Sequence, residues 1–436
     1  MNKSKTVSQA LRNLLLALSF LCLVPAYGQS AAAGSSAATP APPAAGDAGA
    51  ATDSDAEAEA TAVALANLGL ALLRAPGLAA GPGKTNAAHS PLSLLSALAL
   101  VHAGTDADSA RELSQLIGPA PAGEKLFLES YPAVLRQMGG DSLLMANRVW
   151  VGQDVAPQLN EAYLRDVKRR YASDAELIDF EASPLARSTI NAWVADNTGG
   201  RVTDLLKATA LTSGTKLVLT NAVDFKADWE QAFLLTSTKP APFFTAAALP
   251  KNLPTLHQTA VLRHGLLDGA LVAELLFEGR QFSLLLALPP EGQTLQDFDR
   301  TVTGPALVQW RKKIKSGLCA LQLPRFSIQP KTASLKAMLQ ALGVRRVFTS
   351  AANFSPMLGN EGHPVTLDNV YQAAGMRIDE HGAQAVAATA AVTTSKALAP
   401  VSTAQCAFNR PFLWALVHRA SGAPVFMGRV VDPGAD

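Results

Sequence analysis

The first half of the chain carries the apolar periodicity of helices. Residues 54–57 read Ser-Asp-Ala-Glu, the capping-box form that opens a helix, and leucines recur at helical spacing over residues 65–72. Ser90-Pro91 places a capping residue before a proline at the first helical position, and the apolar stretch 92–101 follows as a second helix. Thr105, with two acids just after it, is expected to open a third helix.

The later part of the chain has shorter apolar runs that are typical of strands. The nearly all-apolar run 216–223 predicts a buried strand, and the run 282–288, which two prolines stop, predicts another. Apolar and polar residues alternate less regularly over residues 321–328, which predicts a weaker strand there. Residues 412–417 and 425–431 flank an Ala-Ser-Gly turn and predict a hairpin. Helical patterns crowd the first half and strand patterns the second without regular alternation, which predicts an α+β fold rather than a doubly wound sheet.

The amino terminus has the form of an export signal followed by a tether. Basic residues precede an apolar run at 14–24 that is short for a membrane span, and Ala26 and Gly28 supply the small residues that a signal peptidase reads. We therefore expect residues 1–28 to be a cleaved signal peptide rather than an uncleaved anchor. Residues 29–53 are mostly Ala, Gly, Ser and Pro and are expected to form a flexible linker. This arrangement predicts a secreted or periplasmic protein of bacterial type.

Composition narrows the classes of function. The chain has 436 residues, of which 48% are hydrophobic and only 17% charged. This is enough apolar material for a large core, and it excludes a largely disordered protein or a coiled coil. The formal net charge is +2, so neither a nucleic acid nor an anionic membrane is indicated as a partner. Aromatic residues are sparse at 6%, so base stacking is not indicated either.

The chain carries no local signature of a metal, a cofactor or a catalytic site. It has three cysteines and no Cys-x-x-Cys pair, and none of its seven histidines stands in a His-Glu-x-x-His arrangement. It also has no Gly-x-Ser-x-Gly elbow, Walker loop or Gly-x-Gly-x-x-Gly run. We therefore expect no metal, no cofactor and no catalytic residue, and a protein that is not an enzyme. A dispersed Ser/His/Asp triad is the open alternative.

Several blocks of residues, in chain order, resemble segments of the serpin family of protease inhibitors. They are His89–Ser93, Ala146–Val151, Ile190–Val194 with Thr198–Val202, Asn221–Trp229, and Phe408–Leu413 with Phe426–Val430. Each block alone is weak, but their order and spacing over residues 57–434 are specific. The resemblance implies a single domain, 54–436, in which helices pack on a large mixed β-sheet and smaller sheets. It also implies a monomer whose partner is a target serine protease.

The resemblance makes one segment, about residues 380–405, an exposed reactive-centre loop. Glu380 and Gly382 look like the family's hinge. The strip 383–394 has small side chains, no proline and no charge, so it could slip between two strands of a sheet. Its hinge-side members are Ala383, Ala385, Val386, Ala387, Ala388 and Thr389. The alternative interpretation is an ordinary Ala/Thr-rich surface linker.

The resemblance also indicates where a protease would cut. Inhibitory members are usually cut after the seventeenth residue counted from the hinge glutamate, so the expected scissile bond is Lys396–Ala397. A lysine there fits a trypsin-like protease, whose primary pocket holds a carboxylate. Lys396 could instead be a solubilising charge, and a shift of the cut by one residue would change the target class. The implied mechanism is a suicide trap, in which the cut strip inserts into the main sheet before the acyl bond to the protease is hydrolysed.

A second set of residues is assigned by the resemblance to the region where the sheet opens: Ser90, Ser93, Asn221, Trp229 and Gln372. The family commonly has a histidine at the position of Gln372. Glutamine can still hydrogen-bond to Asn221 and to the region of the two serines, but it cannot titrate. Trp229 is expected either to cover the upper opening or to be a plain core residue.

For three further residues the sequence leaves the bonding partner open. Asp224 lies inside an apolar strand and would need a partner, which the sequence does not name. Cys319 and Cys406 are expected on neighbouring strands beside the loop. Export permits a disulfide between them, but family members rarely need one, which favours two free thiols. The runner-up function is a non-inhibitory binding or carrier protein on the same fold.

Overall fold

The computed structural model describes residues 48–75, 85–119, 121–138, 142–155, 159–245, 249–359, 365–383 and 403–434, with the backbone alone for 48–54 and 328–331. The expected signal peptide and most of the expected linker lie outside the described residues. So does the greater part of the expected insertion strip, together with Lys396 and Ala397. Residues Gly49–Asp436 belong to one compact unit.

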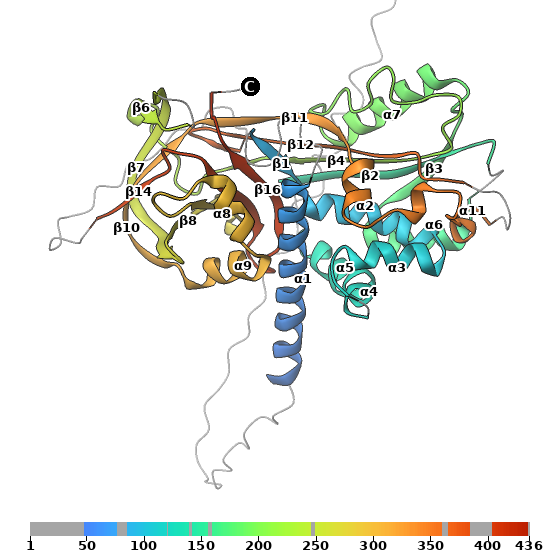
Figure 1. Cartoon of the computed structure of the whole chain (residues 1–436), viewed down its shortest axis with the longest axis horizontal. Helices are drawn as coiled ribbons and strands as arrows, with labels where there is room; N and C mark the ends of the chain where they lie inside the picture. The colour runs from blue at the N-terminus through green and yellow to red at the C-terminus, as the bar shows by residue number, and fades with distance from the viewer. Residues whose placement is uncertain are drawn as a thin grey trace, which may run out of the picture. The chain divides into compact units, whose positions relative to one another are not determined.

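Helices dominate the first part of the chain, as its periodicity predicts (Figure 1). They are α1 (Ala48–Arg74), α2 (Pro91–Gly104), α3 (Ala107–Gln115), α4 (Ala122–Lys125), α5 (Tyr131–Arg136), α6 (Glu161–Tyr171), α7 (Ser183–Asn197), α8 (Leu295–Thr301), α9 (Gly304–Lys313), α10 (Lys336–Ala341) and α11 (Ser355–Leu358). A π-helical turn, Leu126–Ser130, joins α4 to α5. α1 begins at Ala48, so the last residues assigned to the linker are helical, because their alanine-rich sequence favours a helix.

The strands form two sheets. The seven-stranded sheet has the order β3-β2-β4-β12-β13-β5, with β11 also paired to β12. The nine-stranded sheet has the order β1-β16-β15-β9-β8-β7-β10-β14, with β6 also paired to β7. The strands are β1 (Ala87–His89), β2 (Leu143–Gly152), β3 (Asp174–Ile178), β4 (Leu217–Phe225), β5 (Ala227–Asp228), β6 (Lys239–Phe243), β7 (Lys251–Leu267), β8 (Ala270–Leu276), β9 (Phe282–Leu288), β10 (Lys315–Pro324), β11 (Phe326–Ser334), β12 (Asn369–Ile378), β13 (Gly382–Ala383), β14 (Ala404–Ala407), β15 (Phe412–His418) and β16 (Pro424–Val430).

Two further predicted boundaries are wrong, besides the start of α1, which was expected at residue 54 and lies at Ala48. α3 is capped by Asp106 rather than by Thr105, because the Thr105 hydroxyl donates to the Asn353 carbonyl at 3.0 Å and is not available to the helix. The weak strand expected over 321–328 is divided between β10 and β11. The division follows Pro324, which has no N–H to continue the ladder of hydrogen bonds.

β4 is apolar along its whole length because both faces of its sheet are covered. On one face, Val218 and Ala222 pack with Ile190 of α7 in a separate apolar cluster. On the other face, Leu219 and Val223 belong to the main core, to which α2 contributes most of its apolar side chains. Figure 1 shows α7 and α2 on opposite sides of β2 and β4. A strand buried on both faces reads as a continuous apolar run, which is the pattern of residues 216–223.

α1 is long and apolar enough to cross a membrane by length and composition, over Asp55–Arg74, among the described parts of the chain. More than half of this segment is buried within the protein. Its leucines at 65, 68 and 72 join the main core. The core helix of a globular domain passes the same test of length and composition.

Candidate functional site

β4 and β12 are parallel neighbours in the middle of the seven-stranded sheet (Figure 1). Their register runs from Val218 opposite Asn369 to Val223 opposite Ala374. We call this β4–β12 contact the seam. Past the end of the seam, the strand that pairs with β12 on the same edge as β4 is β13, which consists of hinge residues.

The hinge already lies within the sheet. Ala383 pairs with Ile378 of β12 on one side and with Ala227 of β5 on the other, and Gly382 pairs with Asp228. β5 follows β4 after a single residue, so β13 occupies the space between β12 and the continuation of β4. It is antiparallel to both neighbours. A strip that continued β13 would separate the paired residues of the seam one after another.

Gly382 is a position where the backbone requires glycine. Its φ is 148°, and a Cβ built there would lie 2.2 Å from the carbonyl oxygen of Ala227. Such an approach is far closer than real Cβ contacts allow. The close packing of β13 against β5 therefore depends on the missing side chain.

Glu380 anchors the fixed end of the hinge. Its buried carboxylate accepts hydrogen bonds from Arg325 Nε at 2.9 Å and from the Thr238 hydroxyl at 2.5 Å, and its carbonyl oxygen accepts the Phe233 N–H at 2.9 Å. Burial alone would raise the pKa of Glu380. The hydrogen bonds from Arg325 and Thr238 outweigh burial and hold the pKa below its ordinary value.

Trp229 lies against the hinge and is also buried. Its indole N–H donates to the Asp379 carbonyl at 2.9 Å, and its backbone N–H donates to the His381 carbonyl at 2.7 Å. The ring stacks on Phe277 with centroids 4.4 Å apart and meets Phe233 edge-on. The two interpretations of Trp229 are thus compatible, because a buried tryptophan here also holds the hinge in place.

A buried hydrogen-bond network crosses the seam. Gln372 of β12 donates to Asn221 Oδ1 of β4 at 2.6 Å and to the Ser90 carbonyl at 3.2 Å. Asn221 in turn donates to the carbonyl of Ser93 at 2.8 Å and to the side chain of Asn147 in β2. The structure thus brings four predicted sheet-opening residues together and shows both contacts expected of Gln372. It adds Asn147, which lies in the block Ala146–Val151 but was not assigned to the sheet-opening region.

A titratable residue does lie at the seam, but on another element than the family pattern suggests. His89, at the end of β1, is buried beside Gln372. Burial lowers the pKa of His89 to about 4; the Gln372 side chain opposes this shift and the Arg429 guanidinium adds to it. His89 Nε2 and Gln372 Oε1 are both buried without a hydrogen-bond partner among the described residues.

The partner of Asp224 is Arg201, which the sequence did not name. Arg201 Nη1 donates to the Asp224 carboxylate, whose side chain is mostly buried. Arg201 lies in the segment after α7, just beyond the Gly-Gly pair at 199–200. The ion pair resolves the apparent conflict of an acid inside an apolar strand.

The expectation of two free thiols is wrong. Cys319 of β10 and Cys406 of β14 form a disulfide in the structure. The two strands are parallel, with Cys319 opposite Ala404 and Leu321 opposite Cys406, so the cysteines are diagonal neighbours on one face. Free thiols were expected because family members rarely need a disulfide. That expectation took no account of two cysteines that this chain places on adjacent strands.

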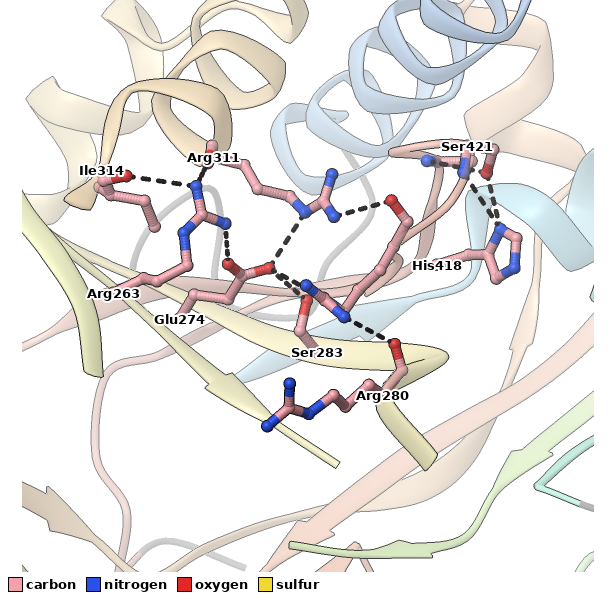
Figure 2. A network of polar contacts seen from close by, with 10 residues as sticks. Arg263, Glu274, Arg280, Ser283, Arg311, Ile314, His418 and Ser421 are labelled. Carbon is pink, nitrogen blue, oxygen red and sulfur yellow. Dashed lines mark hydrogen bonds and ion pairs between the residues drawn. The ribbon is translucent and has the colours of Figure 1, made fainter. Parts of the chain in front are cut away.

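A buried ion cluster was also missed at the sequence level. Figure 2 shows the Glu274 carboxylate accepting hydrogen bonds from Arg263, from Arg311 Nε at 3.0 Å and from the Ser283 hydroxyl at 2.8 Å. Arg419 Nε lies 3.9 Å from the same carboxylate. Three guanidinium groups therefore surround one buried carboxylate, and the local charge is positive.

A cavity of about 490 Å³ adjoins this cluster, between α1, α9 and the strands β9 and β15. Its apolar walls include Leu285, Leu307 and Val417. Its polar lining includes two cations and two acids as well as a hydroxyl: Arg311, Lys312, Asp55, Glu59 and Ser421. The volume lies within the range of small-molecule sites.

Known proteins match the chain over most of its length. A family model described as Serpin (serine protease inhibitor) matches residues 64–433. The leukocyte elastase inhibitor of Bos taurus is 31% identical over 354 residues, which are 79% of this chain and 92% of that protein. The structure of human thyroxine-binding globulin complexed with thyroxine matches with a TM-score of 0.76 at 23% identity, over 87% of this chain and 100% of that one. The thermophilic serpin tengpin in its native state matches with a TM-score of 0.75 at 23% identity, over 85% of this chain and 93% of that one.

Proposed function

The chain belongs to the serpin family of serine protease inhibitors, and on that premise we propose that it is a suicide inhibitor of trypsin-like serine endopeptidases. Its fold is the serpin fold. The proposed scissile bond is Lys396–Ala397, and the proposed insertion strip is 383–394. The protein acts once on each target and supplies no catalytic group.

The observation that carries this proposal is the position of β13. Gly382 and Ala383 pair with β5, and Ala383 also pairs with β12, at the end of the seam that the strip would open. The residue that follows Ala383 would therefore be the first to enter between β4 and β12. The composition of the strip supports insertion, because it has no proline to interrupt the ladder and no charge to bury.

The proposed chemistry belongs to the protease. Its catalytic serine loses its hydroxyl proton and attacks the carbonyl carbon of Lys396, and the bond to the nitrogen of Ala397 breaks. That nitrogen takes up the proton, by way of the protease's own general base, and leaves as a free amine. Lys396 remains as an ester on the protease. The strip then inserts behind Ala383 and carries the protease along before water reaches the ester. The uncut state is held kinetically above the inserted one, and the difference must exceed the stability of a protease domain, about 5–15 kcal/mol.

A denaturing gel tests the trap. The mature protein, residues 29–436, is mixed with trypsin and is expected to give a new band that survives detergent. Without a reductant the band should lie at the summed mass, and with a reductant it should lose the piece 397–436. Lys396→Arg should keep this band and Lys396→Ala should lose it. Thr389→Glu should be cut at Lys396 without forming the band, because a charge in the strip stalls insertion and an acid adds no new site for trypsin. Clean cleavage of the unaltered protein, with trypsin left fully active, would contradict the proposal.

We also infer that the inhibitor acts outside the cytoplasm. The apolar run and small residues of 1–28 and the uncharged composition of 29–53 support this inference. Sequencing the amino terminus of protein recovered from the secretory or periplasmic fraction should show a start at Gln29. A start at Met1 in membranes would instead support an uncleaved anchor.

A carrier protein is the second candidate, and the cavity beside Arg311 favours it. The cavity has apolar walls, and its lining carries two cations, Arg311 and Lys312, and two acids, Asp55 and Glu59, so it suits a small, mostly apolar molecule without a net charge. The carrier interpretation predicts tight binding of such a compound together with no detergent-resistant complex with trypsin. Complex formation with trypsin would exclude carriage as the sole function.

A further inference from the structure

His264, Cys319 and Cys406 come together on three consecutive strands of the nine-stranded sheet, β7, β10 and β14. One ring nitrogen of the histidine and the two sulfur atoms all lie within 4.8 Å of one another. Both cysteines are fully buried, and the histidine is half-buried. Nothing in the proposed inhibition uses this cluster.

The histidine and Cys319 share one face of the sheet, and a glycine leaves room for their approach. β7 and β10 are antiparallel, with Leu262 opposite Gly317 and Ala260 opposite Cys319. Since alternate residues of a strand share a face, His264 points to the same side as Cys319. A Cβ on Gly317 would lie 3.0 Å from Cε1 of His264, so the imidazole lies over the glycine and a side chain there would displace it.

The imidazole is oriented as a metal ligand. Its Nδ1 lies 3.1 Å from the carbonyl oxygen of Leu262. Because a carbonyl oxygen only accepts, Nδ1 carries the proton in this contact, and the lone pair is left on Nε2. A backbone carbonyl that fixes the tautomer in this way is the usual support of a metal-binding histidine.

We propose that His264, Cys319 and Cys406 form a redox-convertible Zn²⁺ site. In the structure the two cysteines are joined as a disulfide. A dithiol reductant supplies two electrons and two protons, so that the S–S bond breaks, two thiols form and the reductant becomes a disulfide. Zn²⁺ then displaces the two thiol protons and is bound by both thiolates and by His264 Nε2. A water molecule completes the tetrahedral set.

The charge balance suits a buried site. Two thiolates and one Zn²⁺ sum to zero, so the reduced site buries no net charge around the fully buried sulfur atoms. Arg263, next to His264 in β7, points to the opposite face and pairs with Glu274. It therefore does not compete with the ion for the thiolates.

Both forms of the site hold β14 in its sheet. β14 has four residues and, among the described strands, pairs with β10 alone. It follows the proposed reactive-centre loop in the chain. The disulfide ties it to β10, and the ion would tie it to β10 and β7 together. Reduced protein without a bound metal ion would have neither the disulfide nor the ion to hold β14 to its neighbours.

Cobalt(II) is the probe, since its absorption reports tetrahedral thiolate coordination directly. The full mature protein is reduced with a dithiol, freed of reductant without oxygen, and titrated with Co²⁺. One equivalent should produce thiolate charge-transfer bands and strong visible bands, and Zn²⁺ should abolish them. The oxidised protein should give neither. His264→Gln should weaken binding about tenfold or more, whereas His257→Gln, on the same strand but outside the cluster, should bind as the unaltered protein does.

His264→Gln keeps both cysteines, so the melting of its oxidised form checks folding separately from metal binding. Failure of the reduced, unaltered protein to give the bands would overturn the proposal and leave the cysteines a disulfide alone. Equal Co²⁺ affinity in His264→Gln and the unaltered protein would also overturn it, because the histidine would then be no ligand.

Discussion

The side-chain amide of Gln372 donates a hydrogen bond to Asn221 Oδ1 at 2.6 Å, and the two residues lie directly opposite each other in the β4–β12 register. Both are buried. No strand can enter the seam without breaking this bond, because its donor and acceptor belong to the two strands that must part. The bond is therefore part of the barrier that keeps the uncut protein closed.

Gln372→Ala should lower the free energy of unfolding by about 1–3 kcal/mol, because it leaves the buried Asn221 oxygen unpaired and removes one of the two hydrogen bonds to the Ser90 carbonyl. It should also speed the loss of inhibitory activity during incubation without protease. Thermal unfolding and residual trypsin inhibition measure the two effects. Gln231→Ala, an exposed position, is the control and should change neither. Unchanged melting in Gln372→Ala would show that the bond does not contribute to closure.

Gly382→Ala should disturb the hinge without touching the scissile bond. The added Cβ would lie 2.2 Å from the Ala227 carbonyl oxygen, which costs about 1–3 kcal/mol in a strained backbone and expels β13 from the sheet. More cut protein and less trypsin complex should appear on the gel. Gly214→Ala is the matched control, since its Cβ would meet nothing closer than 3.7 Å. Equal complex yields in both variants would contradict the role of β13.

Acid should destabilise the protein between about pH 6.5 and pH 4. Burial lowers the pKa of His89, His102 and His418 from 6.5 to about 4. The unfolded chain therefore binds more protons than the folded one in this window, so the stability is complete above pH 6.5 and decreases as the pH falls toward 4. One such group contributes about 3 kcal/mol. Melting temperatures across this window should fall less steeply for His89→Leu, and an identical slope would contradict the account.

The disulfide predicts how the cut protein behaves on a gel. After cleavage at Lys396, the piece that begins at Ala397 contains Cys406 and should remain attached through Cys319 until a reductant is added. Release of this piece without reductant would contradict the bond. Cys406→Ser should lower the free energy of unfolding by about 2–5 kcal/mol, as loss of a native disulfide commonly does.

Local signals in the sequence predict local structure well in this chain. β9 ends where predicted because Pro289 and Pro290 cannot continue a strand. Ser90 caps α2 because its hydroxyl reaches the Ser93 N–H within one turn. Both outcomes depend on residues only a few positions apart.

The features that were missed depend on contacts between distant elements. The pairing of Cys319 with Cys406 depends on the diagonal placement of β14 beside β10, which no spacing in the sequence reveals. The partner of Asp224 depends on where the segment after α7 meets the end of β4. The family pattern places a histidine at position 372, where this chain has glutamine. The histidine beside it, His89, belongs to β1 and reaches the seam only because β1 packs near β12.

The most direct test of the account is the melting of the protein before and after a single cut in the loop. Limited proteolysis between residues 384 and 402, followed by removal of the protease, leaves the strip free to insert into the seam. The account predicts a large rise in melting temperature for the unaltered protein and little rise for Thr389→Glu. An unchanged melting temperature in the cut, unaltered protein would contradict insertion, and with it the trap.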